Sequence, residues 1–268
     1  MMRTLNFILA FFIFGLLNSQ TVQVNYTLTT NKNNHHLSKR GDYQLTANKE
    51  NSLFEPLTND PRDLYKKDPN NIETIWVKDN LYHVNLSQGV TDFSFRDIYY
   101  TDTNYLFYNK ILFNEIAFIK EDFGLFEWQI IGDTKTILGY ECKKAVSQFR
   151  GRLYEAYFTT ELNFKSGPWK FHGLPGLILS VRSVDNYFSI TATSIKIKEN
   201  TVNIDNPFKN KDYLNINQYK KNLKAKYLKM LRAFKSKQPT DPEGGGSVEV
   251  EFNDEIEDLG LETIKFSY

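Results

Sequence analysis

The sequence predicts a mainly β protein, an antiparallel meander or curved sheet, with one long basic amphipathic helix near the C-terminus. Apolar Val22, Val24, Tyr26 and Leu28 alternate with polar residues, which is typical of a half-buried strand. Later strand-like runs are joined by short links that contain Gly, Asn or Asp. Such links join only antiparallel neighbours, because a parallel crossover needs about a dozen residues or more. Apolar residues then recur at spacings of three and four within 210–237, which predicts the helix.

The strands are expected mainly after residue 71. Residues 30–71 are rich in Asn, Asp, Lys and Pro and are expected to form long loops with at most short pieces of structure. A hairpin is expected around the turn pair Asp79-Asn80. Further turns are expected at Asn109-Lys110 and Gly132-Asp133. The remaining strands are expected at 105–108, 111–119, 125–131, 136–138, 140–149, 152–159, 177–184, 187–198 and, last, around 248–252.

The composition indicates a folded protein and excludes several classes of function. Of 268 residues, 41% are hydrophobic and 24% charged, with 33 Lys and Arg against 32 Asp and Glu. This balance argues against nucleic-acid binding, since phosphate recognition needs a cationic excess. Cys142 is the only cysteine, so neither an intramolecular disulfide framework nor a cysteine-based zinc site is available. No cofactor, metal ligand or catalytic residue is expected. No nucleotide-binding glycine motif occurs. The four histidines also lack the spacing of metal ligands: His35, His36, His83 and His172.

The N-terminus is predicted to be a signal peptide over residues 1–19. Arg3 precedes an apolar run over 5–17 that is shorter than the roughly 20 residues of a spanning helix. Cleavage is expected between Ser19 and Gln20, and removal of Arg3 leaves 32 basic and 32 acidic residues. No later stretch is long enough to span a membrane. We therefore expect one exported domain over 20–268 that is periplasmic, associated with the outer membrane or secreted.

The predicted helix is strongly basic and the segment after it is strongly acidic. Residues 206–238 hold ten basic residues and one acid, whereas residues 239–268 hold nine acids and one lysine. In one interpretation the lysines are solvated while the apolar stripe packs on the sheet. In a second, lysines contact anionic lipid headgroups, and in a third the two blocks neutralise one another. The lysines expected at an anionic surface are Lys220, Lys221, Lys224 and Lys226.

Residues 166–180 contain two turn signals inside an aromatic and apolar segment. Pro175 and Gly176 suit a type II turn, in which the glycine takes a positive φ. This segment is either a packing corner that the fold requires or a binding lip for a lipid or peptide. The lip would comprise Gly167, Pro168, Trp169, Phe171, His172, Gly173, Leu174, Pro175, Gly176, Leu177 and Ile178.

The run from Gly173 to Ile178 resembles the defining motif of the GLPGLI family of secreted Bacteroidetes proteins. A second element, Gly-Tyr-Glu-Cys-Lys-Lys-Ala over 139–145, is similar to that family's Gly-Tyr-x-Cys-x-Lys-Ala pattern. The resemblance is specific over about 139–185 and departs from the family at Tyr157-Phe158-Thr159, where Trp-Tyr-Thr is usual. It implies an exported, cell-envelope protein and no assigned reaction.

Three functions are compatible with these features. The first is a non-enzymatic binding protein for an apolar ligand, a lipid or a lipidated partner, held by a half-barrel like that of lipoprotein carriers; a sheet interior filled with side chains would count against it. The second is an accessory module that binds an outer-membrane protein by a sheet edge or by the turn at 166–180. The third is an unrecognised hydrolase, which would need polar groups converging near His172.

Overall fold

The computed structural model describes residues 20–30, 39–57, 75–78, 81–84, 97–112, 115–235, 247–250 and 264–267. The predicted signal peptide, His35 and His36 lie outside the described residues. No helix in the described ranges is long and apolar enough to cross a membrane.

The fold is mainly β, as the sequence predicts, and its main sheet has twelve strands in an open order. From one edge to the other the strands are β14 (Tyr213–Leu214), β8 (Glu115–Asp122), β7 (Tyr105–Leu112), β6 (Tyr99–Thr101), β3 (Ser52–Pro56), β2 (Lys39–Ala47), β1 (Thr21–Thr30), β13 (Phe188–Lys198), β12 (Leu177–Ser183), β11 (Arg152–Thr159), β10 (Tyr140–Phe149) and β9 (Gln129–Ile137).

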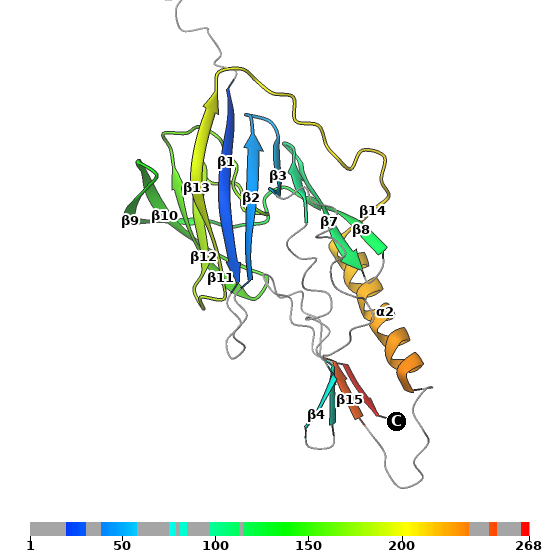
Figure 1. Cartoon of the computed structure of the whole chain (residues 1–268). Coiled ribbons are helices and arrows are strands. Elements are labelled where there is room, and N and C mark those ends of the chain that lie inside the picture. The colour runs from blue at the N-terminus through cyan, green and yellow to red at the C-terminus, as the bar shows by residue number, and fades with distance from the viewer. Residues whose placement is uncertain are drawn as a thin grey trace, which may run out of the picture.

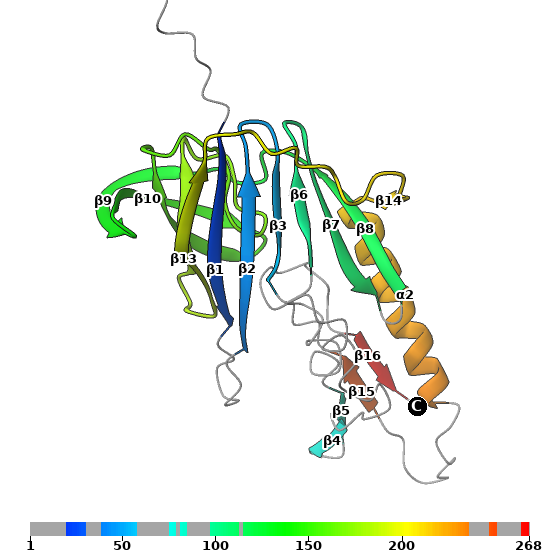
Figure 2. The ribbon, with the colours of Figure 1, turned by 45° about the horizontal axis from the view of Figure 1, so that its top comes forward.

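Two antiparallel meanders meet at the centre of this sheet, and β14 is added in parallel to β8 at one edge. Strands β1 and β13 pair along their whole lengths, from Thr21 opposite Lys198 to Thr30 opposite Phe188. Strand β8 therefore ends the first meander near one edge of the sheet, and β9 begins the second at the opposite edge. The chain passes from one to the other through residues 123–128. Figures 1 and 2 show one curved layer, with β9 and β10 bent away from β1 and β2.

Two tight turns, at 138–139 and 150–151, join β9, β10 and β11 as neighbouring antiparallel strands. Leu138 and Gly139 have φ values of 50° and 88°, and Arg150 and Gly151 have φ values of 43° and 76°. Paired positive φ values are typical of type I′ hairpin turns, whose twist matches that of the flanking strands. Strands β10 and β11 accordingly have the bounds that the sequence predicts.

The helix α2 (Ile216–Lys235) lies along β8, near the edge of the sheet opposite β9 (Figure 2). It begins later than the expected residue 210, because Tyr213 and Leu214 first pair with β8 as the short strand β14. Asn215 and Gln218 cap the helix, since each side-chain oxygen accepts a hydrogen bond from the other residue's backbone N–H. The apolar stripe packs inward: Tyr219, Tyr227 and Leu231 are buried and Leu223 contacts the core.

Three expectations about local structure are wrong. Residues 30–71 contain the strands β2 and β3, in which Tyr43, Leu45 and Phe54 point into the core. Asn109-Lys110 lies inside β7 rather than at a turn, and the Asn109 side chain accepts a hydrogen bond from the N–H of Ile98. Gly132-Asp133 is a bulge within β9. This single strand starts at Gln129 and takes the place of the two strands expected at 125–131 and 136–138. Tertiary pairing overrides the turn propensity of these residues.

A second sheet has the strand order β16 (Ile264–Ser267), β15 (Ser247–Val250), β5 (Leu81–Val84) and β4 (Ile75–Lys78). The hairpin predicted around Asp79-Asn80 is confirmed by the antiparallel pairing of β4 with β5. The last predicted strand is present as β15, which ends at Val250. His83 belongs to β5.

The inner face of the curved sheet is filled with aromatic side chains. Tyr43 stacks on Phe54 with ring centroids 4.7 Å apart, and Tyr154 contacts Phe171, which also contacts Phe188. On the opposite face, the chain before α2 covers part of the sheet and forms a second cluster with it. This cluster comprises Tyr100 and Phe107 of the sheet with Ile204 and Phe208 of the covering chain. Among the described residues the inner face is thus a packed core.

Candidate functional site

The Gly-Leu-Pro-Gly segment before β12 is a tight corner, but not the type II turn that we expected. The N–H of Gly176 donates to the carbonyl oxygen of Leu174 at 2.8 Å, and Leu177 donates instead to Leu162. This two-residue closure is an inverse γ-turn centred on Pro175, whose ring restricts φ to a suitable value. A Cβ atom at Gly176 would lie 2.0 Å from the carbonyl oxygen of Thr159. Close backbone approach therefore requires this glycine.

The preceding turn, at 168–171, places large side chains in the core. Phe171 donates its N–H to the carbonyl of Pro168, and Trp169 takes a φ of 55°. A tryptophan in the left-handed region is uncommon and persists only where its surroundings hold it. Of the residues expected to form a lip, only Gly173 and Pro175 are exposed, and Pro168, Trp169, Leu174, Gly176, Leu177 and Ile178 are buried. Gly167, Phe171 and His172 line an adjacent cleft.

The buried carboxylate of Glu121 contacts two cations and a hydroxyl group beneath this turn. The side chain of Lys170 is 0% exposed, and its Nζ lies 3.3 Å from Glu121 Oε1 and 4.0 Å from the Tyr108 ring centroid. Tyr108 donates its hydroxyl hydrogen to the same Oε1 at 2.6 Å. Arg150 pairs with the other oxygen of Glu121. We call Glu121 and Lys170 the ionic anchor.

A second polar chain holds Trp169. Its indole N–H donates to the hydroxyl oxygen of Tyr99 at 2.8 Å, and Tyr99 donates to Asp97 at 3.1 Å. Lys110 lies 2.5 Å from Asp97. Burial raises the pKa of the Asp97 carboxyl, although Lys110 and the Tyr99 hydroxyl oppose that rise.

His172 is fixed by hydrogen bonds to the backbone at both ring nitrogens. Its Nε2 accepts from the N–H of Gly124 at 3.1 Å, so Nδ1 carries the hydrogen and donates to the carbonyl of Lys170 at 2.6 Å. Burial lowers the pKa of the imidazole to about 4, so the ring is neutral at physiological pH. Trp128 donates its indole N–H to the His172 carbonyl. With both nitrogens occupied, His172 is a structural residue here rather than a free general base.

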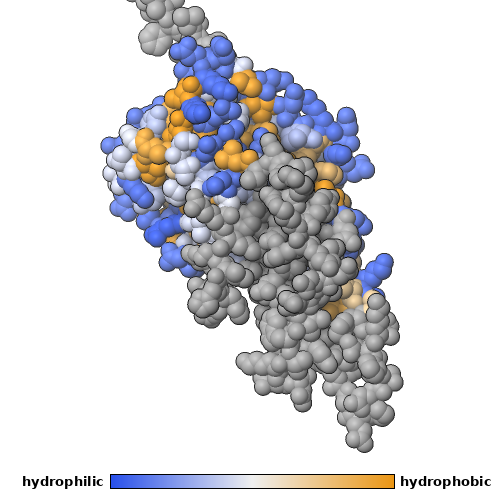
Figure 3. Space-filling model, in the orientation of Figure 1, coloured by the Kyte–Doolittle hydropathy of each residue, from blue (hydrophilic) through white to orange (hydrophobic). Residues whose placement is uncertain are grey.

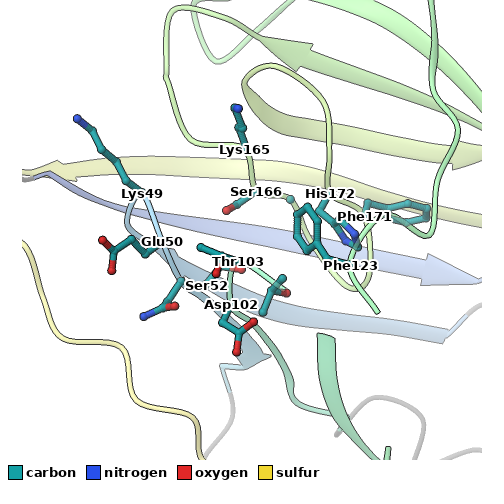
Figure 4. A pocket seen from close by; sticks show the side chains of 13 residues that line it. Lys49, Glu50, Ser52, Asp102, Thr103, Phe123, Lys165, Ser166, Phe171 and His172 are labelled. Atoms are coloured by element: carbon teal, nitrogen blue, oxygen red, sulfur yellow. The ribbon is translucent and has the colours of Figure 1, made fainter. Parts of the chain in front are cut away.

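The cleft lies where several segments of the chain meet, and its volume is about 310 Å³. The turn between β2 and β3 contributes 49–52, the turn between β6 and β7 contributes 101–103, and the segment before the motif contributes 165–167. Phe123, which is 37% exposed, closes one side with its ring centroid 4.0 Å from that of His172 (Figure 4). The rest of the lining is mainly polar: Lys49, Glu50, Asn51, Ser52, Thr101, Asp102, Thr103, Lys165 and Ser166.

Other candidate groups lie away from the cleft lining. Burial raises the pKa of the Cys142 thiol to about 11, which makes it an inert core residue at neutral pH. The described ranges contain no cluster of three or more His, Cys, Asp or Glu residues that could hold a metal ion. Glu155 is held by Lys144 at 2.8 Å and by Arg182 at 2.6 Å, and hydrogen bonds from these cations lower the pKa of its carboxyl.

The lysines expected at an anionic surface differ in their surroundings. Lys221 and Lys224 are exposed on α2, and Lys220 is half-buried. Lys226 lies 2.5 Å from Glu115 of β8. On the face drawn in Figure 3, hydrophobic residues form separate patches among hydrophilic ones.

Comparison with known proteins gives one partial match in sequence. Residues 98–221 match the family model described as "N-glycanase peptide, N-terminal domain", that of PNGase F-II. The match includes Glu121, Phe123, Lys170 and His172, but not the 49–52 side of the cleft. No curated protein matches the chain.

Solved structures give weak similarities. A structure of PNGF-II is 20% identical with a TM-score of 0.49, over 76% of this chain and 33% of that one. An uncharacterised conserved protein from Thermus thermophilus is 8% identical with a TM-score of 0.35, over 74% and 91% of the two chains. A putative outer membrane lipoprotein-sorting protein domain from Vibrio parahaemolyticus is 6% identical with a TM-score of 0.27, over 67% and 86%. The chain spans about a third of the length of the PNGF-II chain that it matches.

The sequence pattern singles out His172 but misses the charged residues that lie near it in the fold. Glu121 stands beside Asp122, and nothing in that pair indicates a distant cationic partner. Lys170 does carry one signal, because it stands between Trp169 and Phe171 in a segment that is otherwise apolar. A charged residue in such a run predicts either exposure or a buried partner.

Proposed function

We propose that the chain is a non-enzymatic binding module that takes a polyhydroxylated ligand, an N-linked glycan, in the cleft beside His172. The observation that carries this proposal is Phe123, a partly exposed aromatic ring beside a mainly polar lining. A ring face binds apolar surface of a ligand, while placed hydroxyl, amide and charged groups fix its orientation. His172 supports the ring rather than performing chemistry, since its nitrogens are both occupied.

The class of ligand is supported by the partial family match. The matching model is named for an N-glycanase, and the matched residues include Phe123 and the 165–172 side of the cleft. The hydroxyls of Ser52, Thr101 and Thr103 are suitable partners for sugar hydroxyls.

The proposal places the ligand differently from our first expectation. An apolar ligand or lipid inside the sheet would need space that aromatic side chains occupy in the described core. We retain export to the cell envelope and membership of the GLPGLI family as parts of the proposal, motivated by residues 1–19 and 173–178. An outer-membrane protein partner is compatible with a glycan-binding module.

The proposal is tested by calorimetric titration of the purified chain with free high-mannose and complex N-glycans. We expect binding by at least one of them, and a loss of about tenfold or more in affinity for Phe123→Ala. Ile197→Ala is the control, because Ile197 is 45% exposed and lies outside the cleft lining.

No glycan binding, or equal affinity in Phe123→Ala, would contradict the proposal. Native mass spectrometry of the chain purified from its own cell envelope supplies a second readout. A lipid-sized adduct there would instead support the apolar ligand.

A further inference from the structure

We propose that the ionic anchor positions the wall of the cleft, so that Glu121 and Lys170 are positioning residues for ligand binding. Its effect on ligand binding rests on the proposed function, whereas the contacts of Glu121 and Lys170 do not. Glu121 lies at the end of β8 and Lys170 lies in the turn before the motif, 49 residues apart in sequence. Their side chains are 5% and 0% exposed.

The two segments that the anchor joins are the two that form the aromatic side of the cleft. Phe123 and Gly124 closely follow Glu121, and His172 follows Lys170 by two residues. A second link joins the same segments, because the Gly124 N–H donates to His172 Nε2 at 3.1 Å. The anchor and this hydrogen bond therefore hold 121–124 against 170–172 at two points. The contact between the Phe123 and His172 rings, which are tilted by 31° with centroids 4.0 Å apart, depends on that alignment.

The anchor is connected to His172 through the backbone as well. The carbonyl of Lys170 accepts the hydrogen bond from His172 Nδ1 at 2.6 Å. A shift of Lys170 consequently changes the orientation of the imidazole and moves the acceptor away from Gly124. Arg150 extends the restraint to the turn between β10 and β11, since it pairs with the second oxygen of Glu121.

Stability alone does not account for a charged pair in this place. Burying two charges has a large desolvation cost, and well-packed apolar residues of similar volume often serve stability as well or better. The surroundings are aromatic and would accommodate such residues: the Lys170 ammonium lies against the rings of Tyr108 and Trp169. What a hydrogen-bonded ion pair adds is a single geometry, and here that geometry sets the cleft wall.

The test removes both charges while keeping the side-chain volumes, in the double variant Glu121→Gln with Lys170→Met. Amide hydrogen exchange, measured by NMR, reports on the wall without any ligand. We expect exchange of the Gly124 amide to accelerate about tenfold or more, while amides of β1 and β13 keep their protection. The matched control is Glu155→Gln with Lys144→Met, which removes an ion pair between β11 and β10 away from the cleft lining.

The outcomes separate the two proposals. Unchanged exchange at Gly124 overturns the anchor, whatever the chain binds. Faster exchange at Gly124 in a chain whose parent binds no N-glycan supports the anchor and contradicts the proposed function. Faster exchange together with at least about tenfold weaker glycan binding supports both. Should the double variant not fold, Glu121→Gln alone is measured in the same way, and normal exchange at Gly124 in it overturns the anchor.

Discussion

The hydroxyl of Tyr26 donates a 2.6 Å hydrogen bond to the carbonyl oxygen of Ile178, 152 residues further along the chain. Both side chains are completely buried. Tyr26 lies in the first strand and Ile178 ends the Gly-Leu-Pro-Gly-Leu-Ile motif, so the bond joins the centre of the sheet to the motif. This contact favours the packing-corner interpretation of 173–178.

Removing that hydroxyl destabilises the protein. In Tyr26→Phe the Ile178 carbonyl loses a buried partner, which costs about 1–3 kcal/mol in the free energy of unfolding. Urea denaturation measures the change. Tyr157→Phe, at a half-buried tyrosine, is the control and changes stability by less than about 0.5 kcal/mol. Equal stability of the Tyr26 variant and the parent would show that the bond is not formed in solution.

Gly176 tolerates no side chain. In Gly176→Ala the new Cβ would lie 2.0 Å from the Thr159 carbonyl oxygen, so the backbone of β11 or the motif must shift. We expect a loss of at least about 2 kcal/mol or failure to fold. Gly132→Ala is the matched control, because a Cβ there meets nothing within 4 Å. Thermal unfolding compares the two, and a Gly176 variant as stable as the control would refute the close approach.

Acid destabilises the protein partly through His172. Its pKa is about 4 in the folded state against an ordinary value of 6.5, so between these pH values the unfolded chain binds more protons. Above pH 6.5 His172 is neutral in both the folded and the unfolded state, so it does not lower the free energy of unfolding. As the pH falls from 6.5 to 4, that free energy drops by up to about 3 kcal/mol.

The variant His172→Gln isolates that contribution, because glutamine keeps an acceptor for Gly124 and does not titrate. It is expected to be less stable than the parent at pH 7 but to lose less stability between pH 6.5 and 4. Urea midpoints across this range measure both curves. Parallel curves would contradict a depressed pKa at His172.

The exposed lysines of α2 are expected to support electrostatic contact with an anionic surface. Because the apolar stripe of α2 is buried, such contact involves charge alone and weakens with salt. Lys221→Glu with Lys224→Glu should abolish binding to vesicles containing phosphatidylglycerol at low salt, as seen by co-sedimentation.

Lys196→Glu with Lys198→Glu on β13 makes the same change in net charge elsewhere and is the control. The lysine substitutions leave Lys226 in place, because it pairs with Glu115. No vesicle binding by the parent, or equal loss in both variants, would remove the membrane interpretation.

Local patterns were sufficient where short turns join neighbouring strands. The bounds predicted for β10 and β11 agree with the structure because Arg150-Gly151 closes the hairpin between them. The same kind of pattern failed at β2 and β3, where loop-forming residues around them obscured the alternation of Tyr43 and Leu45. It failed again at Gly132-Asp133, since a bulge and a turn use the same residues.

The sequence by itself determined the mainly β class, the bounds of β10 and β11, the amphipathic helix and the presence of a turn at Pro175, although not the type of that turn. These depend on periodicity and on turn chemistry, which act over a few residues. Only the tertiary structure decided that β1 pairs with β13 and that Glu121 meets Lys170. Those contacts join residues far apart in sequence, and no local pattern encodes which buried charge will find which partner. The cleft is decided in the same way, because its lining comes from the turns at 49–52 and 101–103, from Phe123 and from residues within 165–172, which lie far apart in sequence.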